Sequence, residues 1–303
     1  MAVLSLATMQ PTSHLEDSMT DSGMPTTGQE MSLSPPTAIY DGPRLRMQGI
    51  SKSFGAVRAL NNVDFEVYAG EVVGLVGDNG AGKSTLIKAI SGVGPCDEGE
   101  IFLEGQPVKI TNPQIATRLG IETVYQDLAL CDNLDVVSNL FLGREENTPF
   151  GTLNEMAMER RGLEVLHTLD VKLPSVRAIV STLSGGQRQS IAVAKAILRK
   201  AKVVLLDEPT AALGVAQTRQ VLQLIRRLRE QGLAVVVISH NLADVFEVVD
   251  RVIVMRLGRR VATFDTASTT PEQVVAAITG AEFGTILQTD GANGNGAIEG
   301  NKL

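Results

Sequence analysis

The chain has 303 residues, of which 44% are hydrophobic and 20% are charged, an ordinary mixture for a soluble globular protein. Its 27 basic and 34 acidic residues give a formal charge of −7. This balance argues against a general nucleic-acid binder, whose affinity depends on Lys and Arg neutralising phosphates. No apolar run approaches the roughly 18 residues of a membrane-spanning helix, so a membrane function would need another chain to cross the bilayer.

Composition separates a central domain from two ends. Residues 1–43 are rich in Ser, Thr, Pro and Met, and residues 284–303 contain the run Gly-Ala-Asn-Gly-Asn-Gly. Both segments are predicted to be disordered tails. The start of the chain lacks a basic region and a long apolar region, so we expect no signal peptide. The folded domain is expected over about residues 44–283.

The first half of this domain begins with short strands between Leu45 and Val67, where apolar and acidic residues alternate. The apolar run Glu71–Val76 follows, then a glycine-rich turn and a helix over Lys83–Ile90. From about residue 127 to 187 the pattern indicates a helical subdomain. One of its helices is expected to place four apolar residues on one face: Met156, Leu163, Leu166 and Leu169.

The second half alternates strands with helices. Apolar strands are predicted at Val203–Leu206 and Leu233–Ser239, separated by an amphipathic helix over Thr218–Glu230. A further helix around Val245 precedes a hairpin that turns at Leu257-Gly258. Such alternation predicts an α/β fold with a mainly parallel sheet and an inserted helical segment.

A glycine-rich loop between the predicted strand and helix matches the pattern G-x-x-x-x-G-K-[ST]. Its backbone N–H groups and the start of the helix would form a cradle for phosphates, because no side chain stands in the way. The lysine would add a charge at the β- and γ-phosphates, and the serine hydroxyl would be a Mg²⁺ ligand. A simple linking turn is the alternative. The loop comprises Gly77, Asp78, Asn79, Gly80, Ala81, Gly82, Lys83, Ser84 and Thr85.

Two carboxylates end the apolar strand Val203–Leu206. Ligands bind at the carboxyl edge of parallel sheets, so Asp207 is a candidate Mg²⁺ ligand. Glu208, one residue further on, is a candidate general base for a water in line with the γ-phosphate. The alternative is a pair of acids that merely cap the strand.

The stretch Leu183-Ser184-Gly185-Gly186-Gln187 has the pattern of a helix start, with Ser184 and Gln187 forming a capping box. The N–H groups of the two glycines could bind a phosphate, but local physics also allows a cap without a ligand.

The same stretch resembles the signature sequence of ABC ATPases, and other motifs of that family follow in the expected order over roughly residues 45–270. Phe54 resembles the aromatic residue that stacks on adenine. Gln126, in Val-Tyr-Gln-Asp, is similar to the glutamine that reaches toward Mg²⁺ and faces the membrane partner. His240, in Val-Ile-Ser-His, is similar to the histidine that contacts the γ-phosphate.

The resemblance implies a P-loop NTPase of the ABC type, with an N-terminal antiparallel β subdomain and an inserted helical subdomain. It also implies a dimer in which two ATP molecules are sandwiched, each between the phosphate loop of one copy and Ser184–Gln187 of the other. Catalytic roles fall on Lys83, Glu208 and His240, and ATP and Mg²⁺ are the implied cofactors. The protein would sit at the cytoplasmic face of the membrane on transmembrane permease subunits.

One position departs from the family pattern. Gly214 stands where most members carry an aspartate that takes part in the dimer. The surrounding Thr210-Ala-Ala-Leu-Gly-Val and the loop sequence Gly77-Asp-Asn-Gly resemble single-domain importers of the ribose, xylose and fructose class. This implies an extracytoplasmic sugar-binding protein as an indirect partner. Three alternatives remain open: an ABC ATPase for another cargo, a soluble ABC ATPase that acts on nucleic acid, and a non-hydrolysing ATP-binding scaffold.

Overall fold

The computed structural model describes residues 40–281, so most of the two predicted tails lies outside the described residues. The chain begins with an antiparallel sheet of four strands in the order β2-β1-β4-β5. Strands are found between Leu45 and Val67 as predicted, but they are not short: β1 has 10 residues and β2 has 11, and the two pair as an antiparallel hairpin. Strand β4 pairs with the other edge of β1. The strands are β1 (Leu45–Phe54), β2 (Val57–Val67), β4 (Glu98–Leu103) and β5 (Gln106–Val108).

A second sheet has six strands in the order β10-β9-β3-β8-β7-β6. All neighbours in it are parallel except the hairpin β9–β10. The predicted mainly parallel α/β fold with an N-terminal antiparallel sheet is thus confirmed. The strands are β3 (Val72–Val76), β6 (Ile121–Val124), β7 (Val203–Asp207), β8 (Ala234–Ile238), β9 (Arg251–Arg256) and β10 (Arg259–Asp265).

The strands of the parallel sheet contribute side chains to two separate hydrophobic cores, because successive side chains of a strand point to opposite faces of the sheet. Val203 and Leu205 of β7 face the core shared with the antiparallel sheet. Val204 and Leu206 of the same strand face the core built by the later helices. Burial on both faces explains why these strands are continuous apolar runs in the sequence.

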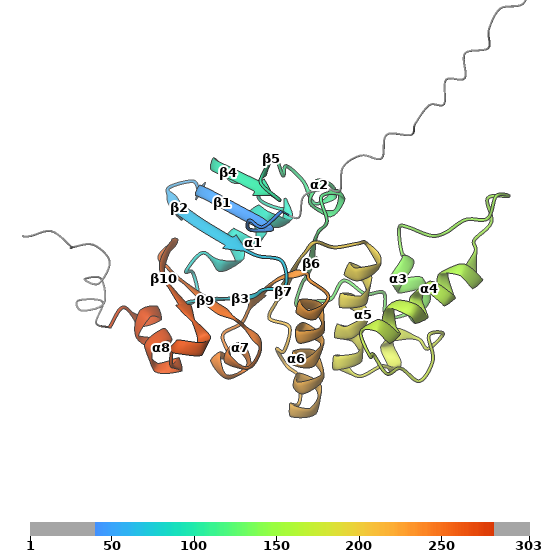
Figure 1. Ribbon diagram of the computed structural model, residues 1–303. Coiled ribbons are helices and arrows are strands. Elements are labelled where there is room, and N and C mark those ends of the chain that lie inside the picture. Colours follow the sequence, from blue (N-terminus) through green and yellow to red (C-terminus); the bar gives the residue numbers. More distant parts are fainter. Residues whose placement is uncertain (1–39, 282–303) are drawn as a thin grey trace, which may run out of the picture. The chain divides into compact units, whose positions relative to one another are not determined.

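Helices cover both faces of the parallel sheet (Figure 1). Helix α1 (Lys83–Ser91) lies between the two sheets, and α2 (Pro113–Arg118) lies on the same side. Helices α5 to α8 cover the opposite face. These are α5 (Gly185–Leu198), α6 (Val215–Glu230), α7 (Leu242–Val248) and α8 (Pro271–Thr279), with short 3₁₀ turns at Val180–Thr182 and Thr266–Ser268.

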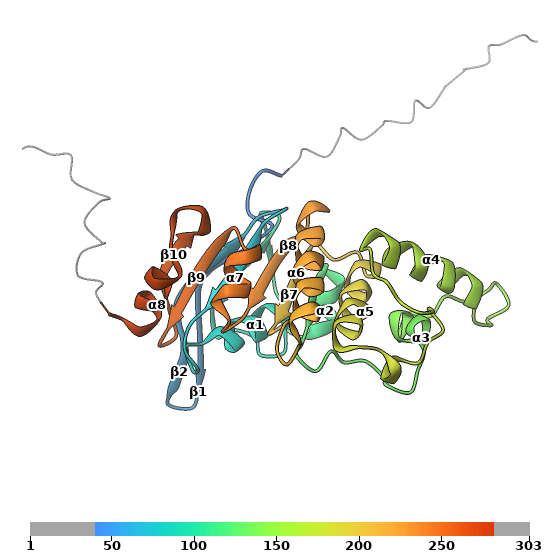
Figure 2. The same ribbon diagram turned by 90° about the horizontal axis from the view of Figure 1, so that it is seen from below.

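The helical segment projects to one side of the sheets, where α3 (Val136–Phe141) and α4 (Glu155–Thr168) pack against α5 (Figures 1 and 2). The predicted face of α4 is partly wrong. Met156 and Leu163 are 85% and 48% exposed, whereas Met158 and Leu166 are buried. Gly162 is also buried, facing Leu140 of α3, and its lack of a side chain lets the two helices approach closely.

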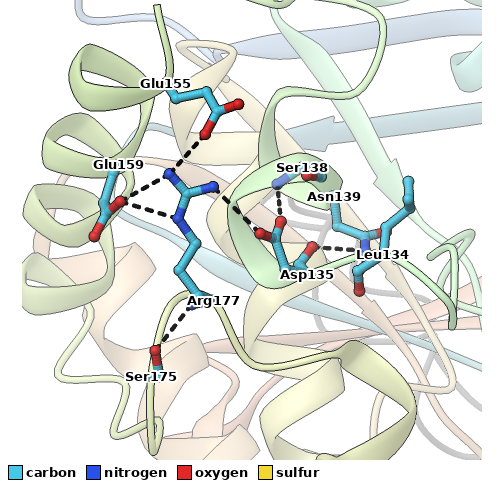
Figure 3. Close-up of polar contacts among 8 residues, drawn as sticks. All are labelled: Leu134, Asp135, Ser138, Asn139, Glu155, Glu159, Ser175 and Arg177. Atoms are coloured by element: carbon cyan, nitrogen blue, oxygen red, sulfur yellow. Dashed lines mark hydrogen bonds and ion pairs between the residues drawn. The ribbon is translucent and has the colours of Figure 1, made fainter.

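Arg177 joins several parts of this helical segment (Figure 3). Its guanidinium donates to Glu159 and Glu155 of α4 and to Asp135, the N-cap residue of α3. The hydrogen bond with Glu159 raises the pKa of Arg177 further above its ordinary value, although partial desolvation opposes this. The loop that leads into Ser184 is therefore fastened to both helices.

Within residues 40–281, no helix is long and apolar enough to cross a membrane.

Candidate nucleotide-binding site

Three neighbouring strands bring the predicted site residues to one edge of the parallel sheet. Strand β8 lies between β3 and β7, and all three run in the same direction. The phosphate loop follows β3, the two carboxylates end β7, and His240 follows β8. Adjacent parallel strands end side by side, so these residues share one carboxyl edge, where ligands of open α/β sheets bind.

The phosphate loop depends on glycine at two positions. Gly77 has a φ of 147° and Gly82 a φ of 103°, values that side chains disfavour. A Cβ on Gly77 would collide with the carbonyl oxygen of Met255, and one on Gly82 would lie 2.8 Å from that of Ala59. The loop is thus wedged between β2 and β9. Gly258 completes the brace, since its N–H donates to Ala81 over 3.0 Å. The sequence predicts the hairpin turn at Gly258 but not this contact.

Lys83 begins α1 and turns its ammonium toward the loop. Its Nζ donates to the carbonyl oxygens of Gly77 over 2.7 Å and of Asp78 over 3.0 Å. Burial lowers the pKa of Lys83, while the negative charges of Glu208, Asp78 and Asp207 oppose that shift. The Lys83 ammonium is therefore a partly desolvated positive charge, held by the carbonyl oxygens of the loop.

Asp207 is the last residue of β7 and is half-buried. Burial and the neighbouring Glu208 carboxylate raise its pKa, against the attraction of Lys83 and Lys88. Such a carboxylate gains most from a cation placed beside it. Its carboxylate, the Ser84 hydroxyl and the Gln126 side-chain oxygen are each a hard oxygen ligand of the kind that Mg²⁺ prefers. Ser84 is exposed in the first turn of α1, and Gln126 is exposed two residues after β6.

Glu208 has a φ of 51°, in the left-handed region that residues other than glycine rarely adopt. Such a conformation costs about 1–2 kcal/mol, and it recurs where a side chain must be aimed. Oε2 of Glu208 lies 2.8 Å from Nδ1 of His240. The His240 side chain is 76% exposed and that of Glu208 only 20%. The carboxylate is therefore the more buried member of the pair, and the imidazole is open to solvent.

Phe54 stands at the tip of the β1–β2 hairpin, paired with Val57. It is 56% exposed, and Nζ of Lys52 lies 5.7 Å from the centre of its ring. Strand β2 reaches the phosphate loop through Ala59, which contacts Gly82. An exposed aromatic face near the loop suits stacking on a nucleobase.

The segment Ser184–Gln187 forms the predicted capping box at the start of α5. Ser184 Oγ accepts from the N–H of Gln187 over 3.3 Å, and Gln187 Oε1 accepts from the N–H of Ser184 over 3.0 Å. Within the described part of the chain, no hydrogen bond joins this segment to the phosphate loop. The loop, the carboxylates and the histidine thus share one sheet edge, whereas Ser184–Gln187 is not bonded to the phosphate loop.

One contact beside Ser184–Gln187 was not predicted from the sequence motifs. A Cβ on Gly185 would lie 2.7 Å from Cδ2 of Leu213, so any other residue there would force the Leu213 side chain to shift. Gly214 is the N-cap residue of α6, and a Cβ there would meet no atom within 4 Å. An aspartate would therefore fit at position 214, and nothing in the local packing explains the glycine.

A phosphate cradle, a strand-end carboxylate pair and a mainly parallel sheet define a P-loop nucleotide-binding protein. The family model for ABC transporters matches residues 60–211. The chain is 48% identical over 247 residues to the fructose import ATP-binding protein FrcA of Rhizobium meliloti, covering 79% of this chain and 95% of the relative. It is 44% identical to the xylose/arabinose import ATP-binding protein XylG of Sulfolobus acidocaldarius, covering 80% and 96%.

Solved structures agree. A crystal structure of the ADP conformation of an ATP-binding cassette of an ABC transporter superposes with a TM-score of 0.66 at 25% identity, covering 79% of this chain and 96% of that one. A dimeric post-hydrolysis cassette bound to ADP and phosphate gives a TM-score of 0.62 at 25% identity, with coverage of 73% and 98%. The chain belongs to the ABC transporter family, as one of its ATP-binding subunits.

Proposed function

We propose that this protein hydrolyses ATP to drive the uptake of a sugar of the fructose, xylose or ribose class through a separate permease. The observation that carries the proposal is the sheet edge at which the phosphate loop, Asp207, Glu208 and His240 meet. The sugar class is supported by the relatives, which are named as import ATP-binding proteins for fructose and for xylose and arabinose.

ATP would bind with its triphosphate along the loop Gly77–Thr85. The N–H groups of the loop and the start of α1 donate to the phosphate oxygens, and Lys83 neutralises part of their charge. Phe54 would stack on the adenine ring. Ser84, Asp207 and Gln126 would hold Mg²⁺, which, when bound, neutralises charge on the β- and γ-phosphates.

Glu208 would act as the general base. Its carboxylate takes a proton from a water molecule as the water oxygen attacks the γ-phosphorus and the bond to the ADP oxygen breaks. His240, within 2.8 Å of Glu208, is placed to steady the carboxylate and to contact the γ-phosphate.

Each site is completed by a second copy of the chain. The capping box uses the N–H groups of Ser184 and Gln187, which leaves those of Gly185 and Gly186 at the helix start for an anion. Within the described residues, no hydrogen bond joins this segment to the phosphate loop of its own chain. In the proposed dimer, this segment contacts the nucleotide held by the partner, so ATP joins the two copies and hydrolysis releases them. The permease would convert this closing and opening into transport at the cytoplasmic face of the membrane.

The substitution Glu208→Gln tests the hydrolytic role. It keeps the size of the side chain but removes the base, so ATP turnover should fall about 100-fold or more. This corresponds to an activation free energy that is higher by at least about 2.7 kcal/mol. ATP affinity should be retained. Turnover is measured as phosphate release and affinity by titration with a fluorescent nucleotide.

Glu247→Gln is a matched control, since Glu247 is an exposed carboxylate on α7 that pairs with Arg226. It should leave turnover unchanged. Near-normal phosphate release by Glu208→Gln would refute Glu208 as the base.

A further inference from the structure

The turn that follows Glu208 carries a hydrogen bond that no motif includes. Oγ1 of Thr210 donates to Oδ2 of Asp244 over 2.7 Å, and the bond is partly buried. Thr210 lies two residues after Glu208, and Asp244 lies in the first turn of α7. The bond therefore spans from the β7 turn to the helix that follows β8. A hydrogen bond from a hydroxyl to a charged, partly buried carboxylate is among the stronger ones in proteins.

The turn itself needs to be held. The φ of Glu208 is 51° and that of Ala212 is 59°, so two residues other than glycine adopt the left-handed conformation within five positions. Such backbones persist only where surrounding contacts enforce them. Inside the turn, the N–H of Ala211 donates to Glu208 O over 3.1 Å. From outside, Glu208 N donates to Ile238 O over 2.9 Å. The Thr210 hydroxyl adds a side-chain bond to the segment after β8.

Asp244 stands on an element that also fixes His240. Asn241 directly follows His240 and caps α7, its Oδ1 accepting from the N–H of Ala243 over 3.1 Å. Val245 of α7 packs on Gly74 of β3, where an added Cβ would lie 2.9 Å from Val245 Cγ1. Helix α7 is thus seated directly on the strand that leads to the phosphate loop. Glu208 and His240 are linked once by their own side chains and a second time through Thr210 and Asp244.

We propose that Thr210 and Asp244 are positioning residues for ATP hydrolysis. Their hydrogen bond joins two segments: the turn that directs the Glu208 carboxylate, and the start of α7, directly after His240. The inference rests on the proposed role of Glu208 as general base. Neither Thr210 nor Asp244 touches the nucleotide in this account. They act by keeping the carboxylate within reach of the attacking water, and small errors in such placement lower rates strongly.

The direct test compares Thr210→Val with Thr210→Ser in the purified full-length chain. Valine keeps the branched shape but removes the hydroxyl donor, and serine keeps the donor. Thr210→Val should lower kcat about tenfold with KM for ATP changed by less than about twofold, whereas Thr210→Ser should stay near wild type. Glu247→Gln, on the same helix, controls for loss of an exposed polar contact. Equal losses in the valine and serine variants, or a loss confined to KM, would overturn the proposal.

A second comparison separates positioning from general weakening of the fold. In a Glu208→Gln background there is no base to aim, so adding Thr210→Val should lower the residual turnover by less than about twofold. A further tenfold loss there would show that Thr210 acts by another route.

Should Thr210→Val fail to fold, Asp244→Ala tests the same bond from the other side, with the same expected losses. If Glu208→Gln alone left turnover normal, the proposed role of Glu208 as general base would be refuted, and the positioning role would fall with it. A kcat for Thr210→Val equal to wild type would remove only the positioning role.

Discussion

At the residue scale, the site concentrates features that a fold designed only for stability would avoid. Lys83 is desolvated, Asp207 has a raised pKa, and Glu208 adopts a left-handed backbone, all at one sheet edge. Perturbed charges and strained backbones cluster at functional sites. The sequence predicts which residues stand here, because the motifs set their identities. It does not predict the conformation of Glu208, since that depends on the packing of the whole turn.

The substitution Lys83→Ala should greatly weaken ATP binding. The loop Gly77–Thr85 would keep its N–H groups but lose its one positively charged side chain. We expect the Kd for ATP to rise about 100-fold or more, or about 2.7 kcal/mol, as measured by nucleotide titration. Affinity close to that of the wild type would show that the backbone cradle alone holds the triphosphate.

The substitution Asp207→Asn should abolish Mg²⁺-dependent hydrolysis yet slightly stabilise the fold. Because the pKa of Asp207 is raised in the folded state, ionisation of this group works against folding. The stability lost in the wild type is therefore absent below the unfolded pKa, grows as pH rises from the unfolded to the folded pKa, and is complete above the folded pKa. Solvent screens a half-exposed group, so the gain at neutral pH should be small, about 2 °C or less in Tm. Thermal unfolding at acid and neutral pH checks this: a lower Tm for the variant at neutral pH would contradict it.

At the scale of elements, α5 combines a structural and a proposed binding role. Its capping box satisfies the backbone of Ser184 and Gln187, and Gly185 accommodates Leu213 from the turn before α6. The segment therefore contacts the same turn that follows Glu208. Under the proposed function, this arrangement would link the place where ATP is cleaved to the place offered to the partner copy.

The substitution Ser184→Arg should abolish turnover while leaving the ATP affinity of the single chain nearly intact. The bulky charge would block the contact with the partner's nucleotide but stands apart from the chain's own phosphate loop. Phosphate release and nucleotide titration on the same preparation measure both effects. Loss of ATP binding by the monomer would place Ser184 in its own chain's site and would refute the shared arrangement.

The elements also show where sequence reasoning stops. Buried parallel strands such as β3, β7 and β8 are readable because both faces are covered, which produces continuous apolar runs. Helix α4 is not read correctly, because it lies at the edge of the helical segment, where only a narrow stripe is buried and Met156 remains exposed. The contacts of Arg177 with three carboxylates join residues up to 42 positions apart, a pairing that no local pattern encodes.

At the scale of the whole molecule, the fold and the family follow from the sequence because several motifs must occur in one order on one sheet. The proposed cooperation between two copies does not follow from the sequence in this way, because it depends on surfaces that face outward. A single chain carries only half of each proposed site, since Ser184–Gln187 is not bonded to the phosphate loop. Gly214 stands where the family resemblance implies an aspartate, and it would leave this cooperation to the remaining contacts of the proposed dimer.

The most direct test of this shared site is the specific ATPase activity of the full-length chain, measured across protein concentration together with its mass by sedimentation. If two copies complete each site, specific activity should rise with concentration and follow the fraction of dimer. Full specific activity at concentrations where the chain sediments as a monomer would contradict the account.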